Sequence, residues 1–223
     1  MSRKSSRRTT QRASRSSAPV VWPGVQGGQF LPLDPGQIDA IHRAALVVLE
    51  RTGMGEIPPV VEQALAEKGL RVGSDGRMSF PPALVEDAIA QARRDVVLWG
   101  QGADTALELR GNRVYVGSGG AAPNVIDRST GAYRPSTLRD LYDAARMVDA
   151  LEHIHFFCRS LVATDLPDPR SLDINTAFAC LAGTGKHVTV QASHPDHVAA
   201  IADLAHSVAG GRDAFAERPI LSL

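Results

Sequence analysis

The chain has 223 residues, of which 43% are hydrophobic, and its formal net charge is zero. This length allows one large domain or two small ones, and no apolar run approaches the ~20 residues that a membrane span requires. The charge is uneven, because residues 1–16 carry six basic and no acidic side chains, whereas the remainder has 18 basic and 24 acidic ones. No basic patch is indicated beyond this segment, which argues against nucleic acid as a partner.

Residues 1–17 are rich in Ser and Arg and almost devoid of apolar side chains, which predicts a disordered basic tail. The Ser-Arg-Arg at 6–8 is similar to a twin-arginine export signal, but the apolar stretch of ~7–15 residues that such a signal needs does not follow. The two cysteines, Cys158 and Cys180, are too few for a disulfide framework and are typical of a reducing compartment. A cytoplasmic location is therefore expected.

A helical layer is predicted for residues 35–94, after a Pro/Gly-rich lead-in. Asp34-Pro35 favours a helix start, since Asp is a good cap and Pro is tolerated in the first turn, and Gly53 ends this helix. Two more helices and one hairpin are expected, at 59–68, 82–93 and 70–80.

Residues 95–135 are rich in strand-forming side chains, with turns expected at Gly111-Asn112 and at 129–131. Thr137 and Asp140 form a capping-box pattern for a helix that reaches about Asp149.

Three apolar strands then begin at Ile154, His187 and Ile220, at a fixed interval of 33 residues. Helical stretches around 172–182 and 196–208 separate them, and alternating strands and helices of this length predict parallel strands joined by helical crossovers. The predicted fold class is α/β: a partial TIM-type (β/α)₈ barrel with an amino-terminal helical layer and small β-hairpins. The helical and hairpin region occupies residues 18–112, and the first strands and helices of the barrel occupy 113–223. Because Leu223 falls inside the third strand, we expect the chain to cover only the front part of the barrel.

Two glycine-rich segments are similar to phosphate-binding motifs. The segment 117–122 (GSGGAA) formally matches a dinucleotide fingerprint, but Pro123 and a predicted hairpin follow instead of the required helix, so a tight turn is favoured. The Gly-Thr-Gly-Lys at 183–186 lacks the earlier Gly and the following Ser/Thr of a phosphate loop, and that interpretation is rejected.

Histidines raise the question of a metal. His153, His155 and Cys158 are close in sequence, but residues 153 and 155 face one side of a strand and 158 faces the other, so no shared metal is predicted. For His194 and His197 the spacing allows joint metal binding, and an exposed helix start is the simpler interpretation.

Alternation in the repeated strands indicates which side chains face a barrel interior. In the first strand Ile154, Phe156 and Cys158 share the face expected to pack on helices, and His155, Phe157 and Arg159 share the other. In the second strand Val188 and Val190 share the helix face, which leaves His187, Thr189 and Gln191 inside. Arg159 and Gln191 end their strands at the carboxyl side, where α/β barrels place their chemistry, although a role as polar core filler is equally compatible.

Several segments of the chain resemble the trimethylamine methyltransferase family, which also contains glycine-betaine methyltransferases. The segments that carry the resemblance are WPGVQGGQFLPLD, IHRAALVVLERTG, FPPALVEDAIAQA, RVYVGSGGAAPNVIDRSTGAYRPSTLRDLYDAARMVDAL, IHFF and LDINTAFACLAGTGKHV. The resemblance covers most of residues 22–223 and implies a (β/α)₈ barrel that moves a methyl group from a methylated amine to the cobalt of a corrinoid. It implies that no cofactor is bound directly, because a separate corrinoid protein carries the cobalamin. Members specialised for trimethylamine use pyrrolysine, at a position beyond residue 223.

For such a substrate an onium-binding pocket is required, and Trp22, Trp99, Tyr115, Phe156 and Phe157 are the aromatic candidates. We expect the substrate-binding residues to be Tyr115, Ser118, Gly119, Gly120, Arg159 and Gln191, with Arg159 holding the carboxylate of a betaine-like substrate in one version. Catalytic residues are not assigned. A non-catalytic remnant that binds a partner protein through its helical end is the alternative. An open half-barrel exposes a strand edge, so aggregation or a homo-oligomer is expected when this piece is expressed alone.

Overall fold

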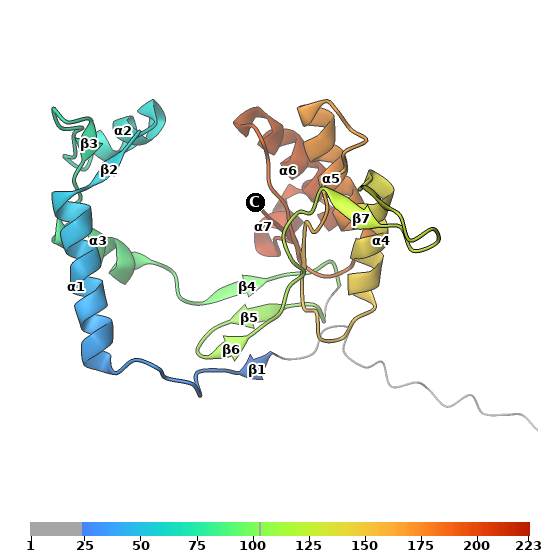
Figure 1. Ribbon diagram of the computed structural model, residues 1–223, viewed down its shortest axis with the longest axis horizontal. Coiled ribbons are helices and arrows are strands. Elements are labelled where there is room, and N and C mark those ends of the chain that lie inside the picture. Colours follow the sequence, from blue (N-terminus) through green and yellow to red (C-terminus); the bar gives the residue numbers. More distant parts are fainter. Residues whose placement is uncertain (1–23, 103) are drawn as a thin grey trace, which may run out of the picture. The chain divides into compact units, whose positions relative to one another are not determined.

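The computed structural model describes residues 24–102 and 104–223, which divide into two compact units (Figure 1). The helical unit comprises residues 26–96 and 110–112, and the carboxyl-terminal unit contains residues 97–109 and 113–223. The predicted disordered tail and Trp22 lie outside the described residues. In the described part of the chain, the helices are too short or too polar to cross a membrane.

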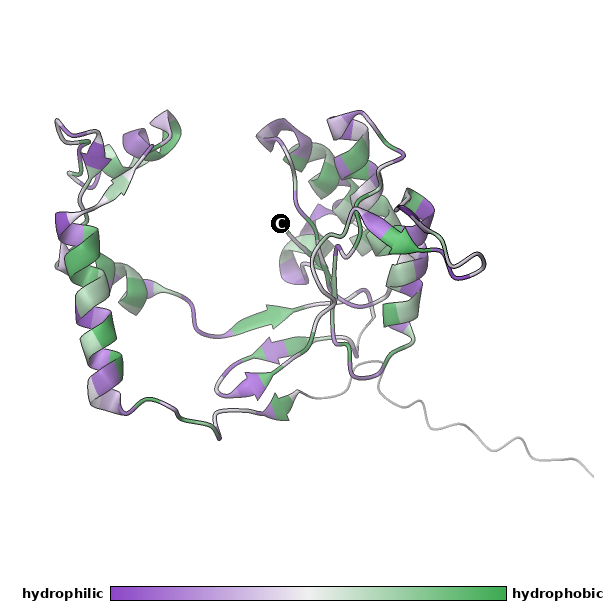
Figure 2. Ribbon diagram, viewed as in Figure 1, coloured by the Kyte–Doolittle hydropathy of each residue, from purple (hydrophilic) through white to green (hydrophobic). Residues whose placement is uncertain are grey.

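The helical unit begins as local sequence signals predict. α1 (Pro35–Arg51) starts behind a capping box in which Asp34 and Gln37 each accept a hydrogen bond from the other's backbone N–H, at 2.9 and 3.0 Å. Hydrophilic and hydrophobic residues alternate along α1 (Figure 2), and Ile38 and Ile41 remain more than half exposed. The unit also contains α2 (Pro59–Ala66) and α3 (Pro82–Gln91), so all three predicted helices are confirmed.

The hairpin predicted at 70–80 is also present, with an antiparallel bridge between Val72 and Met78 and with Gly76 in the left-handed region at φ +76°. An additional pairing was not predicted: β3 (Arg77–Met78) runs antiparallel to β2 (Met54–Gly55). Met78, which takes part in both pairings, is fully buried. Four further short strands have the bounds β1 (Val25–Gln26), β4 (Val96–Leu98), β5 (Leu107–Leu109) and β6 (Arg113–Val114).

In the carboxyl-terminal unit, the three repeated segments form one parallel sheet, as predicted. Its strand order is β11 (Leu221–Ser222), β10 (Val188–Thr189), β9 (Phe157–Cys158), so strands consecutive in this repeat are neighbours in the sheet. The unit is therefore a mixed α/β structure. Within the described residues the strands close no barrel.

Four helices belong to this unit: α4 (Leu138–Asp149), α5 (Pro169–Gly183), α6 (Pro195–Ala209) and α7 (Arg212–Glu217). α4 packs on α5 and α5 packs on α6. The core lies between these helices and one face of the sheet, where Phe157, Val188 and Leu221 meet Leu141, Ala177 and Ile201. Burial of the larger of these side chains stabilises a fold by roughly 1.5–3 kcal/mol each.

A hairpin joins the start of α4 to the sheet region. β7 (Asn124–Ile126) and β8 (Tyr133–Pro135) pair antiparallel around the predicted turn at 129–131. Arg134 of β8 forms ion pairs with both Asp127 and Asp140, at 3.0 and 2.7 Å. Asp140 also completes the predicted capping box with Thr137, so the hairpin and the first turn of α4 are held as one piece.

The structure corrects the predicted faces of the first repeated strand. Phe157 pairs with Val188, and Cys158 pairs with Thr189, so Phe157 is on the helix-packed face and Cys158 is on the opposite one. The alternation in the second strand is as predicted. The mistake arose because the segment 154–156 is mostly irregular and β9 begins only at Phe157, so an alternation counted from Ile154 puts Phe157 on the wrong face.

Candidate functional site

The glycine-rich segment 116–122 lies parallel to β9 as an irregular strand. Parallel bridges join Gly117 to Phe156 and Ala122 to Leu161, and the N–H of His155 donates to the carbonyl of Val116 at 2.7 Å. This segment is thus a fourth parallel partner in the order 116–122, β9, β10, β11. No helix starts there, because β7 follows, so this segment lacks the helix start that a dinucleotide fingerprint requires.

Ser118 holds this segment against β9. Its Oγ donates to the carbonyl of Cys158 at 2.7 Å and accepts from the N–H of Cys158 at 2.9 Å. The hydroxyl therefore replaces a backbone pairing that the irregular strand does not make. Both hydrogen bonds of the Ser118 hydroxyl go to the backbone of Cys158, so in this structure the predicted site residue has a structural role.

A small cavity opens at the carboxyl ends of these parallel strands. Its volume is about 50 Å³, and its lining residues are Gly120, Ala121, Cys158, Arg159, Thr189, Val190 and Gln191. Three predicted site residues, Gly120, Arg159 and Gln191, therefore lie together. Cys158 was missed because its face was assigned incorrectly, and the cross-strand register with Thr189 is the information that was lacking.

Arg159 and Gln191 contact each other at this cavity. The guanidinium Nη2 of Arg159 donates to Oε1 of Gln191 at 3.0 Å. Within the described ranges, no carboxylate lies at ion-pair distance from Arg159. A half-buried cation that has a neutral amide as its partner attracts an anionic ligand group, since guanidinium–carboxylate bonds are among the strongest hydrogen bonds in proteins.

Two other predicted site residues do not line the cavity. Tyr115 is half-buried and packs edge-on against His155, with ring centroids 5.2 Å apart. Gly119 is exposed, and a Cβ built on it meets no atom within 4 Å. The structure thus gathers half of the predicted set and leaves Tyr115, Ser118 and Gly119 beside it.

Lys186 has a structural role that rules out phosphate binding by the Gly-Thr-Gly-Lys segment, as predicted. Its side chain is fully buried, and Nζ donates to the carbonyls of Val148, Leu151 and Ile154 at 2.8, 2.7 and 2.6 Å. Burial lowers the pKa of this ammonium. The Lys186 ammonium therefore caps the carboxyl end of α4, where carbonyls without an intrahelical partner favour a cation.

The histidines near the sheet are also engaged. His187 is buried between the carbonyl of Trp99, 2.8 Å from Nδ1, and the Oγ of Ser222, 2.7 Å from Nε2. His155 accepts a hydrogen bond from the N–H of Val116 through Nδ1 at 2.9 Å. Burial lowers the pKa of both rings. No group of three metal-ligating side chains occurs in the ranges that the structure describes.

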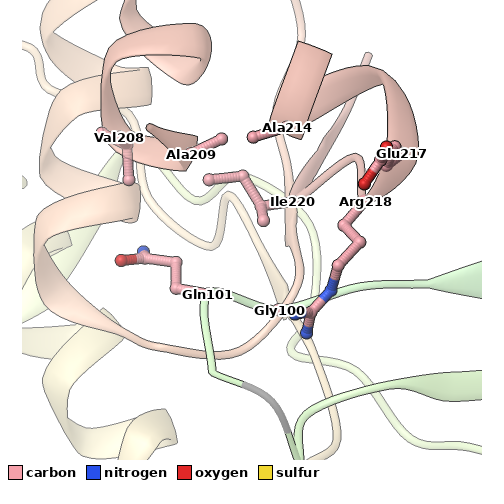
Figure 3. A pocket seen from close by; sticks show the side chains of 8 residues that line it. All are labelled: Gly100, Gln101, Val208, Ala209, Ala214, Glu217, Arg218 and Ile220. Atoms are coloured by element: carbon pink, nitrogen blue, oxygen red, sulfur yellow. The ribbon is translucent and has the colours of Figure 1, made fainter. Parts of the chain in front are cut away.

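A larger cavity of about 170 Å³ lies near the opposite, amino ends of the strands (Figure 3). Arg218, which lines it, stacks over the ring of Trp99 at 4.8 Å and donates to the carbonyl of Gly102 at 3.1 Å. Glu217 lines the same cavity, which balances the positive charge. This cavity lacks the excess positive charge that distinguishes the one at Arg159.

The family model for trimethylamine methyltransferase (MTTB) matches residues 2–223. The chain belongs to the trimethylamine methyltransferase family. It is 30% identical over 199 residues to trimethylamine methyltransferase MttB of Desulfitobacterium hafniense, an alignment that covers 89% of this chain and 40% of that protein. It is 26% identical to MttB1 of Methanosarcina mazei, over 89% of this chain and 41% of the relative, and 27% identical to MttB of Methanosarcina barkeri, over 84% and 39%. The chain thus spans about 40% of the length of these relatives.

Membership of the trimethylamine methyltransferase family confirms the resemblance found from the sequence segments. The match includes both the helical unit and the parallel sheet. The cavity at Arg159 therefore lies within the part of the family fold that this chain contains.

Proposed function

We propose that this chain is part of a methyltransferase that moves a methyl group from a methylated amine to the cobalt of a corrinoid. The observation that carries the proposal is the cavity at the carboxyl ends of parallel strands, lined by Arg159 and Gln191, in a member of this family. The names of the relatives support a methylated amine as the substrate class.

We also propose that the sheet is the front part of a (β/α)₈ barrel. The strand order 116–122, β9, β10, β11 follows the sequence without a reversal, and α4, α5 and α6 pack on one another in the same order. A doubly wound sheet reverses its strand order at a switch point, whereas a barrel does not. Barrel enzymes place their active sites at the carboxyl ends of the strands, which is where the cavity opens.

The charge in the cavity favours one kind of methylated amine. A guanidinium whose partner is a neutral amide repels an onium ion but binds a carboxylate. Arg159 therefore supports a betaine-like substrate, which has both groups, over a trimethylamine-like one. The volume of about 50 Å³ is a few times the ~10–15 Å³ that one water requires, which suits part of a small ligand. In the proposal, Arg159 anchors the carboxylate, and Gln191 holds the guanidinium.

This chain's residues supply binding and orientation. A reduced corrinoid would supply the nucleophilic cobalt, and we place it on a separate protein, as the resemblance to the family implies. Arg159 fixes one end of the substrate and thereby directs a methyl group away from the strand ends. Positioning of this kind contributes strongly to rate, since aligned reactants avoid an entropic penalty.

The test is methyl transfer to free, reduced cobalamin by the complete protein, with trimethylamine, glycine betaine and tetramethylammonium as donors. We expect transfer to be fastest from the carboxylate-bearing donor, followed by the change in cobalamin absorbance and by the demethylated product. Arg159→Ala should remove this preference, whereas Arg128→Ala, an exposed arginine in the β7–β8 turn, should keep it. Absence of transfer from every methylated amine would refute the proposal.

A further inference from the structure

We infer that Asp173 is a positioning residue that fixes the Arg159–Gln191 pair through the loop between β10 and α6. The inference rests on the proposed function, because Asp173 would act on the substrate only through the Arg159–Gln191 pair. Asp173 belongs to α5 and is only 2% exposed. Its Oδ2 accepts three hydrogen bonds, from the N–H and Oγ of Ser193 and from Nδ1 of His197, each at 2.7 Å.

These bonds fix the chain on one side of Gln191, and the sheet fixes it on the other. The N–H of Val190 donates to the carbonyl of Ser222 on β11 at 3.1 Å. Only Gln191 and Ala192 lie between this bond and Ser193. Gln191 is itself exposed, so its side chain gains little orientation from packing. The direction of its amide toward Arg159 therefore depends on the two anchored backbone points.

Asp173, His197 and Ser193 do not form a nucleophilic triad. In a triad the serine hydroxyl bonds to the histidine, whereas here Ser193 and His197 both donate to the same carboxylate oxygen. Burial favours the neutral acid, but the bonds from His197 and Ser193 outweigh it and lower the pKa of Asp173. An ionised, buried carboxylate with three donors is a rigid anchor, since charged hydrogen bonds are short and strong.

The two histidines at the start of α6 differ in exposure. His194 caps α6 as expected for an exposed helix start, with Nδ1 accepting from the N–H of Asp196 at 3.2 Å. His197 is buried against Asp173, so the exposed interpretation is wrong for this residue. Asp173 was not singled out, because its partners are 20 and 24 residues away and no local pattern joins them.

The first test measures the state of Arg159 without any substrate. Phenylglyoxal modifies free guanidinium groups, and its rate at Arg159 is followed by peptide mass spectrometry in the full chain. We expect Gln191→Ala and Asp173→Asn each to raise this rate by about fivefold, the effect of losing one exposed hydrogen bond of ordinary net strength. Asp168→Asn is the matched control, because Asp168 caps the same helix through Ser171 and makes no bond to the loop after β10.

A milder variant guards against loss of folding. Ser193→Ala removes one of the three bonds to Asp173 from an exposed position, and we expect a smaller rise in the same direction. Wild-type modification rates in both Asp173→Asn and Ser193→Ala, with a raised rate in Gln191→Ala, would overturn the inference. A wild-type rate in Gln191→Ala would overturn it too, because no pair would then exist for Asp173 to hold.

The second test uses kinetics of the complete protein. With glycine betaine as donor, Asp173→Asn should raise KM by about fivefold and leave kcat near that of the wild type, because the anchor for the carboxylate is weakened. With tetramethylammonium, KM should not change. A general loss of folded protein lowers kcat for both donors and leaves the KM ratio as it was, which would count against a positioning role. The modification assay needs no turnover. Its result therefore tests the role of Asp173 even if the methyl-transfer assay refutes the proposed function.

Discussion

The guanidinium of Arg159 and the amide of Gln191 meet at 3.0 Å, although the two residues are 32 positions apart in the chain. They meet because β9 and β10 are adjacent and parallel, so both carboxyl ends reach the same edge of the sheet. The amide engages Nη2, one of the several N–H donors of the guanidinium. A neutral partner orients the cation without cancelling its charge, which keeps it suited to an anionic ligand.

Removal of the Arg159 charge should weaken binding of carboxylate-bearing ligands. We expect Arg159→Ala in the complete protein to lower the affinity for glycine betaine by about tenfold or more, the range for a charged hydrogen bond of ~1.5–3 kcal/mol. Titration calorimetry measures the change, with Arg128→Ala as the control. Equal affinities of the wild type and Arg159→Ala for glycine betaine would show that the guanidinium does not hold the carboxylate.

A side chain at Gly117 should require the ring of Phe156 to move. The ring of Phe156 occupies the place where a Cβ on Gly117 would lie. We therefore expect Gly117→Ala to lower the free energy of unfolding by about 1–3 kcal/mol, the usual penalty of overpacking. Urea denaturation measures it, and Gly119→Ala, with open space around its Cβ, should have a much smaller effect. Additional replacement of Phe156 by Ala should relieve the clash, and a double variant with strictly additive losses would contradict this explanation.

Lys186 should be needed for stability. In Lys186→Met the carbonyls of Val148, Leu151 and Ile154 lose their shared donor in a buried site. The expected loss in the free energy of unfolding is about 2–4 kcal/mol, because unsatisfied buried polar groups are costly. Arg146→Met, at an exposed position of α4, is the control and should change stability by well under 1 kcal/mol. Thermal or urea unfolding of both variants checks the difference, and equal midpoints would contradict the buried role.

Stability should fall on mild acidification because of His187. Its folded-state pKa is lowered by burial, so between that value and the unfolded pKa of about 6.5 the unfolded state binds more protons. The neutral ring's contribution is thus complete above pH 6.5 and decreases as the pH falls. From pH 7.5 to 5.5 we therefore expect a loss of stability from this group, and His155 adds a loss of the same sign.

Urea midpoints at the two pH values give the measurement. His187→Gln should reduce the difference between them, and His194→Asn, which keeps a good helix cap on an exposed position, should preserve it. Two hydrogen-bonded carboxylates, the half-buried Asp140 and the buried Asp173, do not obscure the result. The pKa values of Asp140 and Asp173 are lowered, so their contributions are lost only at pH values below the ordinary carboxyl range. An unchanged pH difference in His187→Gln would rule out its burial as the source.

The candidate site was predictable in part. Arg159 and Gln191 were found because polar residues at the carboxyl ends of repeated strands meet once the strands pair in parallel. Cys158 and Asp173 were missed. The face of Cys158 depends on where a two-residue strand begins, and the partners of Asp173 come from the next loop and helix.

The sequence by itself determined the helix starts and the turns, because a capping box such as Thr137 with Asp140 joins atoms only three residues apart. It also determined the alternation of strands and helices, since apolar periodicity is local. Only the tertiary structure decided that Phe157 faces the helices and that Lys186 closes α4. The physical reason is that a short strand has too few residues to fix its own face. The cross-strand register with Val188 therefore determines which face Phe157 occupies. The partners of the buried Lys186 are carbonyls distant in sequence, which only the packing of the chain brings within hydrogen-bond distance.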